Sequence, residues 1–366
     1  MLDPFPFEAP KALQRAVEPL AYRLGLTTLP IHIHEVLLAA LLYHVTCTVV
    51  SPWLSTRFFP KIYPQFNRRT RINWDVHVVS LLQSTLINAV ALWVHWVDDE
   101  RAEMNWRGRV WGYTGGCGLV QALACGYFVW DLWISLRYVR EFGLGLLAHA
   151  VSALAVFSFG FRPFVNYYAT TFILYELSSP FLNVHWFCDK LNLTGSKLQL
   201  YNGFLLIGSF FGARLCWGTY SSIRCFYDVY RALTQPGGPA DTATSHMMRF
   251  AGDEQTVPMW LAYTYLASNL TLNSLNFYWF GKMIETVRKR FDPPLGTKRP
   301  AKKAKKEEEK VLVEGIELDT DEEVEQRTNG STTAVETDPV VARGLYDDGR
   351  RTIEVSQTEI RSRQRG

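Results

Sequence analysis

Long apolar runs constrain this chain more than any other feature of its sequence. A bilayer core about 30 Å thick is crossed by roughly 20 apolar residues in a helix, and seven stretches of the chain are of this kind. Trp and Tyr recur at the ends of the runs, where amphipathic rings mark the membrane interface. The runs are 34–55, 75–97, 111–136, 144–160, 164–188, 201–226 and 258–284. The sequence therefore predicts an all-α, polytopic membrane bundle of about seven transmembrane helices.

Charge is concentrated outside this apolar body. Residues 290–366 hold 32 of the 73 Asp, Glu, Lys and Arg residues and none of the 12 Trp. The alternative, a soluble protein with seven buried helices, would need polar helix faces that the body lacks. Residues 290–366 contain one Phe and one Tyr, which is too little to bury a core, so this tail is predicted to be disordered.

Lys and Arg in the loops predict how the chain lies in the membrane. The loops at 56–74, 137–143 and 189–200, with the end of the last run, carry 12 basic residues and two acidic ones. The opposite loops carry six basic and eight acidic residues. Basic residues accumulate on the cytosolic side. We therefore predict a lumenal N-terminus, a cytosolic C-terminus and a multi-pass protein.

Two segments outside the apolar runs are predicted to lie near the membrane surface. In the lumenal segment 1–33, Pro10–Leu24 places apolar residues on one helical face, which is compatible with an interfacial helix. In the cytosolic tail, the cluster Lys298–Lys306 is expected to attract anionic headgroups. The other readings of this cluster are a solvated basic stretch and a nuclear-localisation signal, and the second conflicts with seven membrane spans.

Polar residues inside the runs are the candidates for function, because each is costly in the bilayer and tends to face the bundle interior. Asp75, His77, Asp131 and His149 are predicted to converge at the cytosolic mouth of an interior cavity. Glu176 and Arg214 lie near the bilayer midplane, each about 12 residues from either end of its run, and are predicted to pair. The candidate lipid-binding residues are Asp75, His77, Asp131, His149, Glu176, Ser178, Asn183 and Arg214.

Several of these runs resemble one family of membrane proteins. The segments FVNYYATTFILYELSSPFLNVHWFCDKL and YNGFLLIGSFFGARLCWGTY, with GYFVWDL and AHAVSAL before them, resemble the TLC-domain family, which includes the ceramide synthases. The resemblance covers about 69–289 and is strongest to the non-synthase transmembrane TLC-domain proteins. It implies a six-helix bundle around a lipid-accessible cavity, usually in the endoplasmic reticulum, with 34–55 as an extra helix in front.

The resemblance also shows where the chain departs from the ceramide synthases. Their paired His-His appears here as Ala148-His149, and their HD-x-S-D arrangement reads Tyr175-Glu176-Leu177-Ser178-Ser179. His149 and Glu176 could supply a general base for acyl transfer but leave little for the remaining steps. Enzyme activity is therefore left open.

Two functions remain from the sequence. The first is a membrane protein that binds or senses lipid in an intramembrane cavity and contributes to membrane lipid homeostasis. The second is an N-acyltransferase of ceramide-synthase type, in which acyl-CoA is a substrate and a sphingoid base is the acceptor. We expect no cofactor, no metal and no nucleic-acid partner, and the six cysteines are interpreted as small buried residues. The oligomeric state stays open.

Overall fold

The computed structural model describes residues 1–366 except 163, 236–245, 252–256, 296–310, 314–315 and 319–366. The chain divides into two compact units, and the first, residues 1–307 with 313–316, contains all the described helices. In the tail, β1 (Val311–Val313) and β2 (Ile316–Leu318) form a two-stranded sheet. The rest of the predicted disordered tail, including Lys298–Lys306, lies outside the described residues.

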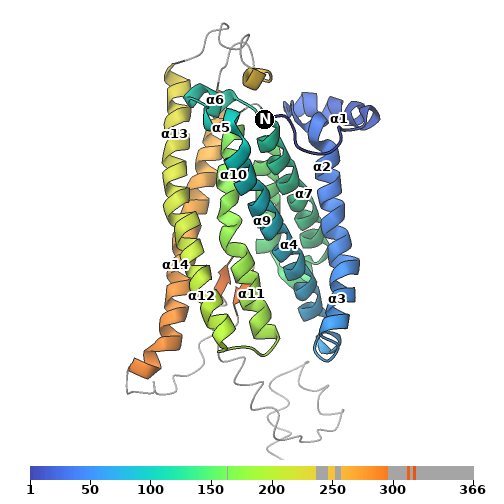
Figure 1. Ribbon diagram of the computed structural model, residues 1–366, viewed down its shortest axis with the longest axis vertical. Coiled ribbons are helices and arrows are strands. Elements are labelled where there is room, and N and C mark those ends of the chain that lie inside the picture. Colours follow the sequence, from blue (N-terminus) through green and yellow to red (C-terminus); the bar gives the residue numbers. More distant parts are fainter. Residues whose placement is uncertain (163, 236–245, 252–256, 296–310, 314–315, 319–366) are drawn as a thin grey trace, which may run out of the picture. The chain divides into compact units, whose positions relative to one another are not determined.

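The first unit is built from helices throughout (Figure 1). In chain order they are α1 (Lys11–Leu24), α2 (Leu29–Val45), η1 (Thr46–Val50), α3 (Ser51–Phe58), η2 (Tyr63–Gln65), α4 (Arg68–Val97), α5 (Asp99–Ala102), α6 (Trp106–Trp111), α7 (Gly115–Arg137), α8 (Val139–Phe142), α9 (Leu144–Phe159), η3 (Asn166–Tyr168), α10 (Ala169–Phe172), η4 (Ile173–Ser178), α11 (Ser179–Lys190), α12 (Lys197–Phe210), η5 (Phe211–Trp217), α13 (Gly218–Thr234), η7 (His246–Met248) and α14 (Met259–Leu295).

Each predicted apolar run coincides with a helix or with a series of consecutive helices, so the all-α membrane bundle is confirmed. Within the described residues, three of these helical segments are long and apolar enough to cross a membrane: Leu29–Phe58, Arg68–Val97 and Trp106–Arg137. That the other four runs cross it stays a prediction. Helix α14 continues to Leu295, so the first six residues of the predicted tail, 290–295, are helical.

Side chains at the helix ends explain why several helices begin where they do. The side chains of Asn67, Thr114 and Ser196 accept hydrogen bonds from backbone N–H groups in the first turns of α4, α7 and α12. These N–H groups have no partner within the helix, and short polar side chains satisfy them. The predicted helix at Pro10–Leu24 forms as α1, and Gly25 ends it in the left-handed conformation.

Contacts between the helices show which of the apolar runs lie side by side. Helix α2 packs against α7, α7 packs against α9, and α1 packs against α2. Helix α4 packs against both α11 and η4, while η5 contacts η4 and α14. Helix α4 therefore lies beside the fifth apolar run, and the fifth run lies beside the sixth. This arrangement brings the polar residues of these runs together.

The fifth and sixth runs are less regular than the sequence predicts. The fifth combines the 3₁₀ segments η3 and η4 with the α-helices α10 and α11, and the sixth contains the π-helix η5. Pro180 gives a physical reason in the fifth run, because proline has no N–H to donate to the carbonyl four residues earlier. Irregular turns of both kinds occur frequently at functional sites or hinges.

Candidate functional site

His77 and Asn183 join helix α4 to helix α11. The two side chains are buried, and His77 Nδ1 lies 2.8 Å from Asn183 Oδ1. Because an amide oxygen only accepts hydrogen bonds, the histidine nitrogen is the donor. Asn183 Nδ2 in turn donates to Ser80 Oγ at 2.9 Å, and the His77 ring stacks on Trp186 with centroids 3.8 Å apart. Every polar atom of Asn183 is therefore used in holding these two helices together.

Asp75 faces a different part of the bundle from His77. Its carboxylate accepts hydrogen bonds from Ser51 Oγ at 2.6 Å and from Tyr63 OH at 3.0 Å. Residues two apart on a helix point in different directions, so Asp75 meets α3 and η2 while His77 meets α11. Their separation by two positions in the sequence already indicates this difference.

Asp131 and His149 lie on two other helices, α7 and α9. Asp131 is half-buried on α7, and His149 is exposed on α9. That these two residues and Asp75 and His77 converge at one polar mouth stays a prediction.

Arg214 is the charged centre of the bundle interior. It belongs to the π-helix η5 and is 3% exposed. Its Nε donates to Ser178 Oγ at 3.1 Å, and its Nη1 donates to Asn276 Oδ1 at 3.2 Å. The guanidinium also lies over the Phe210 ring, 4.8 Å from the centroid, an arrangement that favours a cation. Three helical segments, η4, η5 and α14, therefore meet at this one side chain.

Glu176 belongs to η4, the 3₁₀ segment that packs against the π-helix of Arg214. The side chain of Glu176 is half-buried, and η4 packs against η5. The backbone carbonyl of Glu176 accepts a hydrogen bond from Asn88 Nδ2 at 2.8 Å. Pro180 cannot donate to this carbonyl, but the N–H of Ser179 does so in a 3₁₀ turn, and Asn88 of α4 adds a second hydrogen bond. An ion pair between Glu176 and Arg214 stays a prediction.

Buried polar side chains of these helices form hydrogen-bonded groups inside the bundle, which we together call the interior polar cluster. Its members are buried side chains of α4, η4, α11, η5 and α14: His77, Asn88, Ser178, Asn183, Arg214 and Asn276. Ser178 and Asn183 are candidates from the sequence that the structure places beside Arg214 and His77 respectively. A cluster of this kind costs free energy in a membrane unless its hydrogen bonds are made.

A partly buried arginine, Arg109, was not anticipated as a site from the sequence. Arg109 of α6 forms a two-pronged ion pair with Asp228 of α13, at 2.6 and 2.8 Å. Tyr168 OH donates to the same carboxylate at 2.6 Å. In the sequence, both residues lie in predicted loops on the same side of the membrane. The one feature that could have indicated the pair is that they carry opposite charges next to the ends of two apolar runs. The pair fastens α6 and η3 to α13.

Long apolar helices surrounding a buried polar cluster define a helical integral membrane protein, and the comparisons agree. A family model described as the TLC domain matches residues 73–285. The chain belongs to the TLC-domain family, and the matched residues lie within the region 69–289 expected from the sequence.

Three relatives illustrate this membership. The chain is 38% identical to an uncharacterised TLC domain-containing protein of Schizosaccharomyces pombe, over 77% of this chain and 87% of that protein. It is 29% identical to topoisomerase I damage affected protein 4 of Saccharomyces cerevisiae, over 72% of this chain and 86% of that protein. It is 30% identical to TLC domain-containing protein 4 of Homo sapiens, over 45% of this chain and 62% of that protein. These names confirm the resemblance to TLC-domain proteins that are not ceramide synthases. No solved structure matches the chain.

Proposed function

We propose that this protein binds an anionic membrane lipid at the interior polar cluster and so contributes to lipid homeostasis of the endoplasmic reticulum membrane. The observation that carries the proposal is the placement of Arg214. It lies buried in a π-helical turn, and its guanidinium contacts a hydroxyl of η4 and an amide of α14. The family membership supports a lipid ligand, and the chemistry of arginine supports an anionic one.

Arginine suits this role because its guanidinium stays charged and presents donors in a fixed fork. Such a fork binds the oxygens of phosphate or carboxylate groups, and charge-assisted hydrogen bonds are roughly twice as strong as neutral ones. The contacts with Ser178 Oγ and Asn276 Oδ1 are with neutral acceptors. An anionic headgroup can replace such contacts at a gain in free energy, while the ligand's acyl chains pack against apolar helix surfaces.

The cluster lies deep along the helices rather than at their ends. Arg214 stands 17 residues after Lys197, where α12 begins, which is about 25 Å along a helix that rises 1.5 Å per residue. In the proposed orientation the N-terminus is lumenal and the C-terminus cytosolic, as the loop charges predict. The headgroup of a lipid bound at this depth would lie inside the bundle instead of at the membrane surface. Such a position suits a protein that binds or senses lipid.

The acyltransferase alternative gains no support from the geometry. His149, the candidate base, is exposed on α9. Among the described contacts, those of the interior polar cluster join α4, η4, α11, η5 and α14, and α9 supplies none of its members. We therefore propose lipid binding without acyl transfer.

Mass spectrometry of lipids that co-purify with the protein in mild detergent tests this proposal. We expect one class of anionic lipid to be enriched in the wild type relative to the membrane extract. Arg214→Gln should lose that enrichment, and Arg214→Lys, which keeps the charge but not the fork, should retain part of it. Arg224→Gln is the matched control, because Arg224 lies ten residues further along the same helical segment and packs over Tyr167.

The comparison is valid only for folded protein, so each variant is first checked for a single peak in size-exclusion chromatography and for its melting temperature. Equal lipid profiles in the wild type and in a folded Arg214→Gln variant would show that Arg214 does not hold the ligand. A profile changed equally by Arg224→Gln would point to general disturbance of the bundle.

A further inference from the structure

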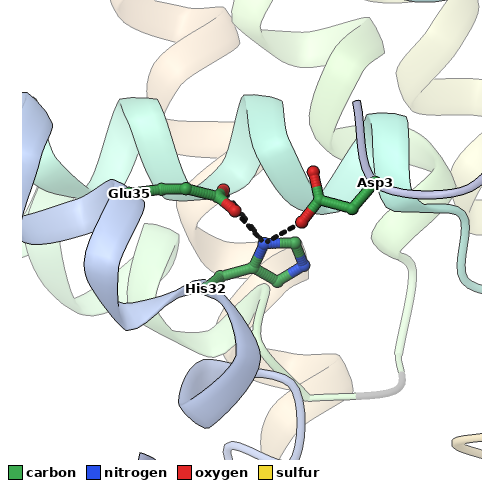
Figure 2. A group of neighbouring side chains, drawn as sticks. All are labelled: Asp3, His32 and Glu35. Atoms are coloured by element: carbon green, nitrogen blue, oxygen red, sulfur yellow. Dashed lines mark hydrogen bonds and ion pairs between the residues drawn. The ribbon is translucent and has the colours of Figure 1, made fainter. Parts of the chain in front are cut away.

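Three side chains with metal-ligand chemistry converge where the N-terminal segment meets helix α2 (Figure 2). They are Asp3, His32 and Glu35, and one ligand atom from each lies within 4.8 Å of the others. The side chains of His32 and Glu35 are 0% exposed, and that of Asp3 is 31% exposed. This site lies outside the interior polar cluster and is independent of the lipid proposal.

The local structure explains how the three residues meet. His32 and Glu35 are three apart on α2, so they occupy one face of that helix. His32 Nδ1 lies 2.9 Å from Glu35 Oε2 and 3.4 Å from Asp3 Oδ2. Asp3 comes from the segment before α1, so it closes the group from the opposite side, as Figure 2 shows.

The other nitrogen of the histidine ring is held by a tyrosine. His32 Nε2 lies 2.5 Å from Tyr113 OH, just before α7. When Nε2 carries the proton and donates it to the tyrosine oxygen, Nδ1 presents its lone pair to the two carboxylates. The unprotonated nitrogen and the two carboxylates then face one another. None of them can donate a hydrogen bond to another, and together they attract a cation. Metal-ligating histidines are commonly oriented in this way through their second nitrogen.

The close approach of His32 and Tyr113 depends on Gly118 of α7. A Cβ atom added at Gly118 would lie 2.3 Å from His32 Nε2 and 2.7 Å from Tyr113 OH. Both distances are too short for non-bonded atoms, so the absence of a side chain at this position is what allows the ring and the hydroxyl to meet. The orientation of the histidine is thus built into the packing of α2 on α7.

The spacing of the ligand atoms fits a small divalent ion. Ligands about 2.0–2.1 Å from a tetrahedral zinc are about 3.3 Å from one another, and here the histidine nitrogen is 2.9 and 3.4 Å from the two carboxylate oxygens. One imidazole and two carboxylates form a donor set that zinc accepts, whereas calcium and magnesium prefer oxygen alone. Three protein ligands leave a fourth position for water.

We propose that Asp3, His32 and Glu35 bind a zinc-class divalent metal ion that fastens the N-terminal segment to helix α2. Binding a metal only in the folded state contributes to folding stability. The ion would also neutralise two carboxylates that are held close together beside the first predicted span. The competing arrangement is a proton shared within the same cluster, with Tyr113 donating to His32.

Zinc binding to purified full-length protein without a polyhistidine tag distinguishes the two arrangements. After treatment with a chelator, Zn²⁺ is added back, and its stoichiometry and affinity are measured by elemental analysis and titration. We expect about one ion per chain and a higher melting temperature with Zn²⁺. Co²⁺ substituted at the site should give the visible absorption of a four-coordinate ion.

The variants are chosen to remove ligands with little other change. Asp3→Asn removes one charge while its remaining oxygen can still accept from the backbone N–H of Phe5, as Asp3 Oδ1 does at 3.0 Å. We expect at least tenfold weaker Zn²⁺ binding for Asp3→Asn and for His32→Ala, a loss of the size seen when metal-site residues are changed. His44→Ala is the control, because His44 is exposed on the same helix, and it should bind as the wild type does.

Two results would overturn the proposal. One is a wild type that binds no more Zn²⁺ than His32→Ala, which would assign the cluster to a shared proton. The other is an Asp3→Asn variant with wild-type affinity. If His32→Ala fails to fold, Asp3→Asn still decides, because Asp3 is partly exposed and lies outside the helices.

Discussion

Two arginines inside the bundle, the partly buried Arg109 and the buried Arg214, are held in different ways. Arg109 donates hydrogen bonds to both carboxylate oxygens of Asp228, at 2.6 and 2.8 Å, and Tyr168 OH donates to the same carboxylate. Arg214 donates to the hydroxyl of Ser178 and the amide oxygen of Asn276, at 3.1 and 3.2 Å. Arg109 lies in the short helix α6, whereas Arg214 lies in the π-helix η5.

The difference separates a group that fixes the packing of helices from one suited to a ligand. A two-pronged arginine–carboxylate pair is strong and defined in geometry, so it fixes α6 against α13. Hydrogen bonds to a hydroxyl and an amide oxygen are weaker, and the proposed function requires an anionic ligand to replace them. Three predictions test this comparison and the packing around it, and a fourth tests the orientation of the chain in the membrane.

The largest effect is expected for Asp228→Asn. The substitution keeps the size of the side chain but leaves the charge of Arg109 buried without its carboxylate, which costs about 3–5 kcal/mol. Thermal unfolding in detergent should show a large fall in melting temperature. The double variant Arg109→Gln with Asp228→Asn should regain much of the loss. A single variant that melts as the wild type does would contradict the structural role.

A smaller loss is expected for Gly218→Ala, beside the interior polar cluster. A Cβ atom at this position would lie 2.4 Å from the Tyr175 ring, and such overpacking costs about 1–3 kcal/mol. Gly212→Ala is the control on the same helical segment, because a Cβ atom there meets nothing within 4 Å. It should gain up to about 1 kcal/mol from helix propensity. Equal melting temperatures for the two variants would show that η4 and α13 are not closely packed.

Arg214→Gln should change stability by only about 1 kcal/mol, because removing a buried charge also removes the cost of burying it. Its main effect should be on bound lipid. If instead Glu176 and Arg214 form a structural pair, Glu176→Ala should be strongly destabilising, and Glu176→Gln with Arg214→Gln should recover much of the loss. Melting temperatures of these three variants decide between the two roles. A fall as large as that of Asp228→Asn would remove the contrast between the arginines.

No change at all is expected at the glycosylation sequons beginning at Asn192, Asn269 and Asn329. The orientation predicted from loop charge places them in a cytosolic loop, in the last span and in the cytosolic tail. Enzymatic deglycosylation should therefore leave the electrophoretic mobility unchanged. Ala240→Asn, which precedes Asp241 and Thr242, adds a sequon to a predicted lumenal loop and should produce a shift. A shift traced to Asn329 would reverse the orientation.

The fold class could be predicted from the sequence because membrane-spanning helices are marked by continuous apolar runs. Apolar runs of sufficient length form helices, and their positions are visible residue by residue. The family was equally visible, because the segment around Glu176 and Ser178 carries its motifs. The irregular turns were less visible. Pro180 marks one of them, while nothing in the sequence marks the π-helix at Phe211–Trp217.

The sequence by itself determined that this is a helical membrane protein of the TLC-domain family with costly polar residues in its interior. Only the tertiary structure decided which of them meet. His77 and Asn183 are 106 residues apart and Arg109 and Asp228 are 119 apart, so their contacts depend on how helices rotate and pack rather than on local spacing. Asp3 and His32 were missed for the same reason, because a carboxylate outside the helices becomes a neighbour of α2 only after the chain folds back.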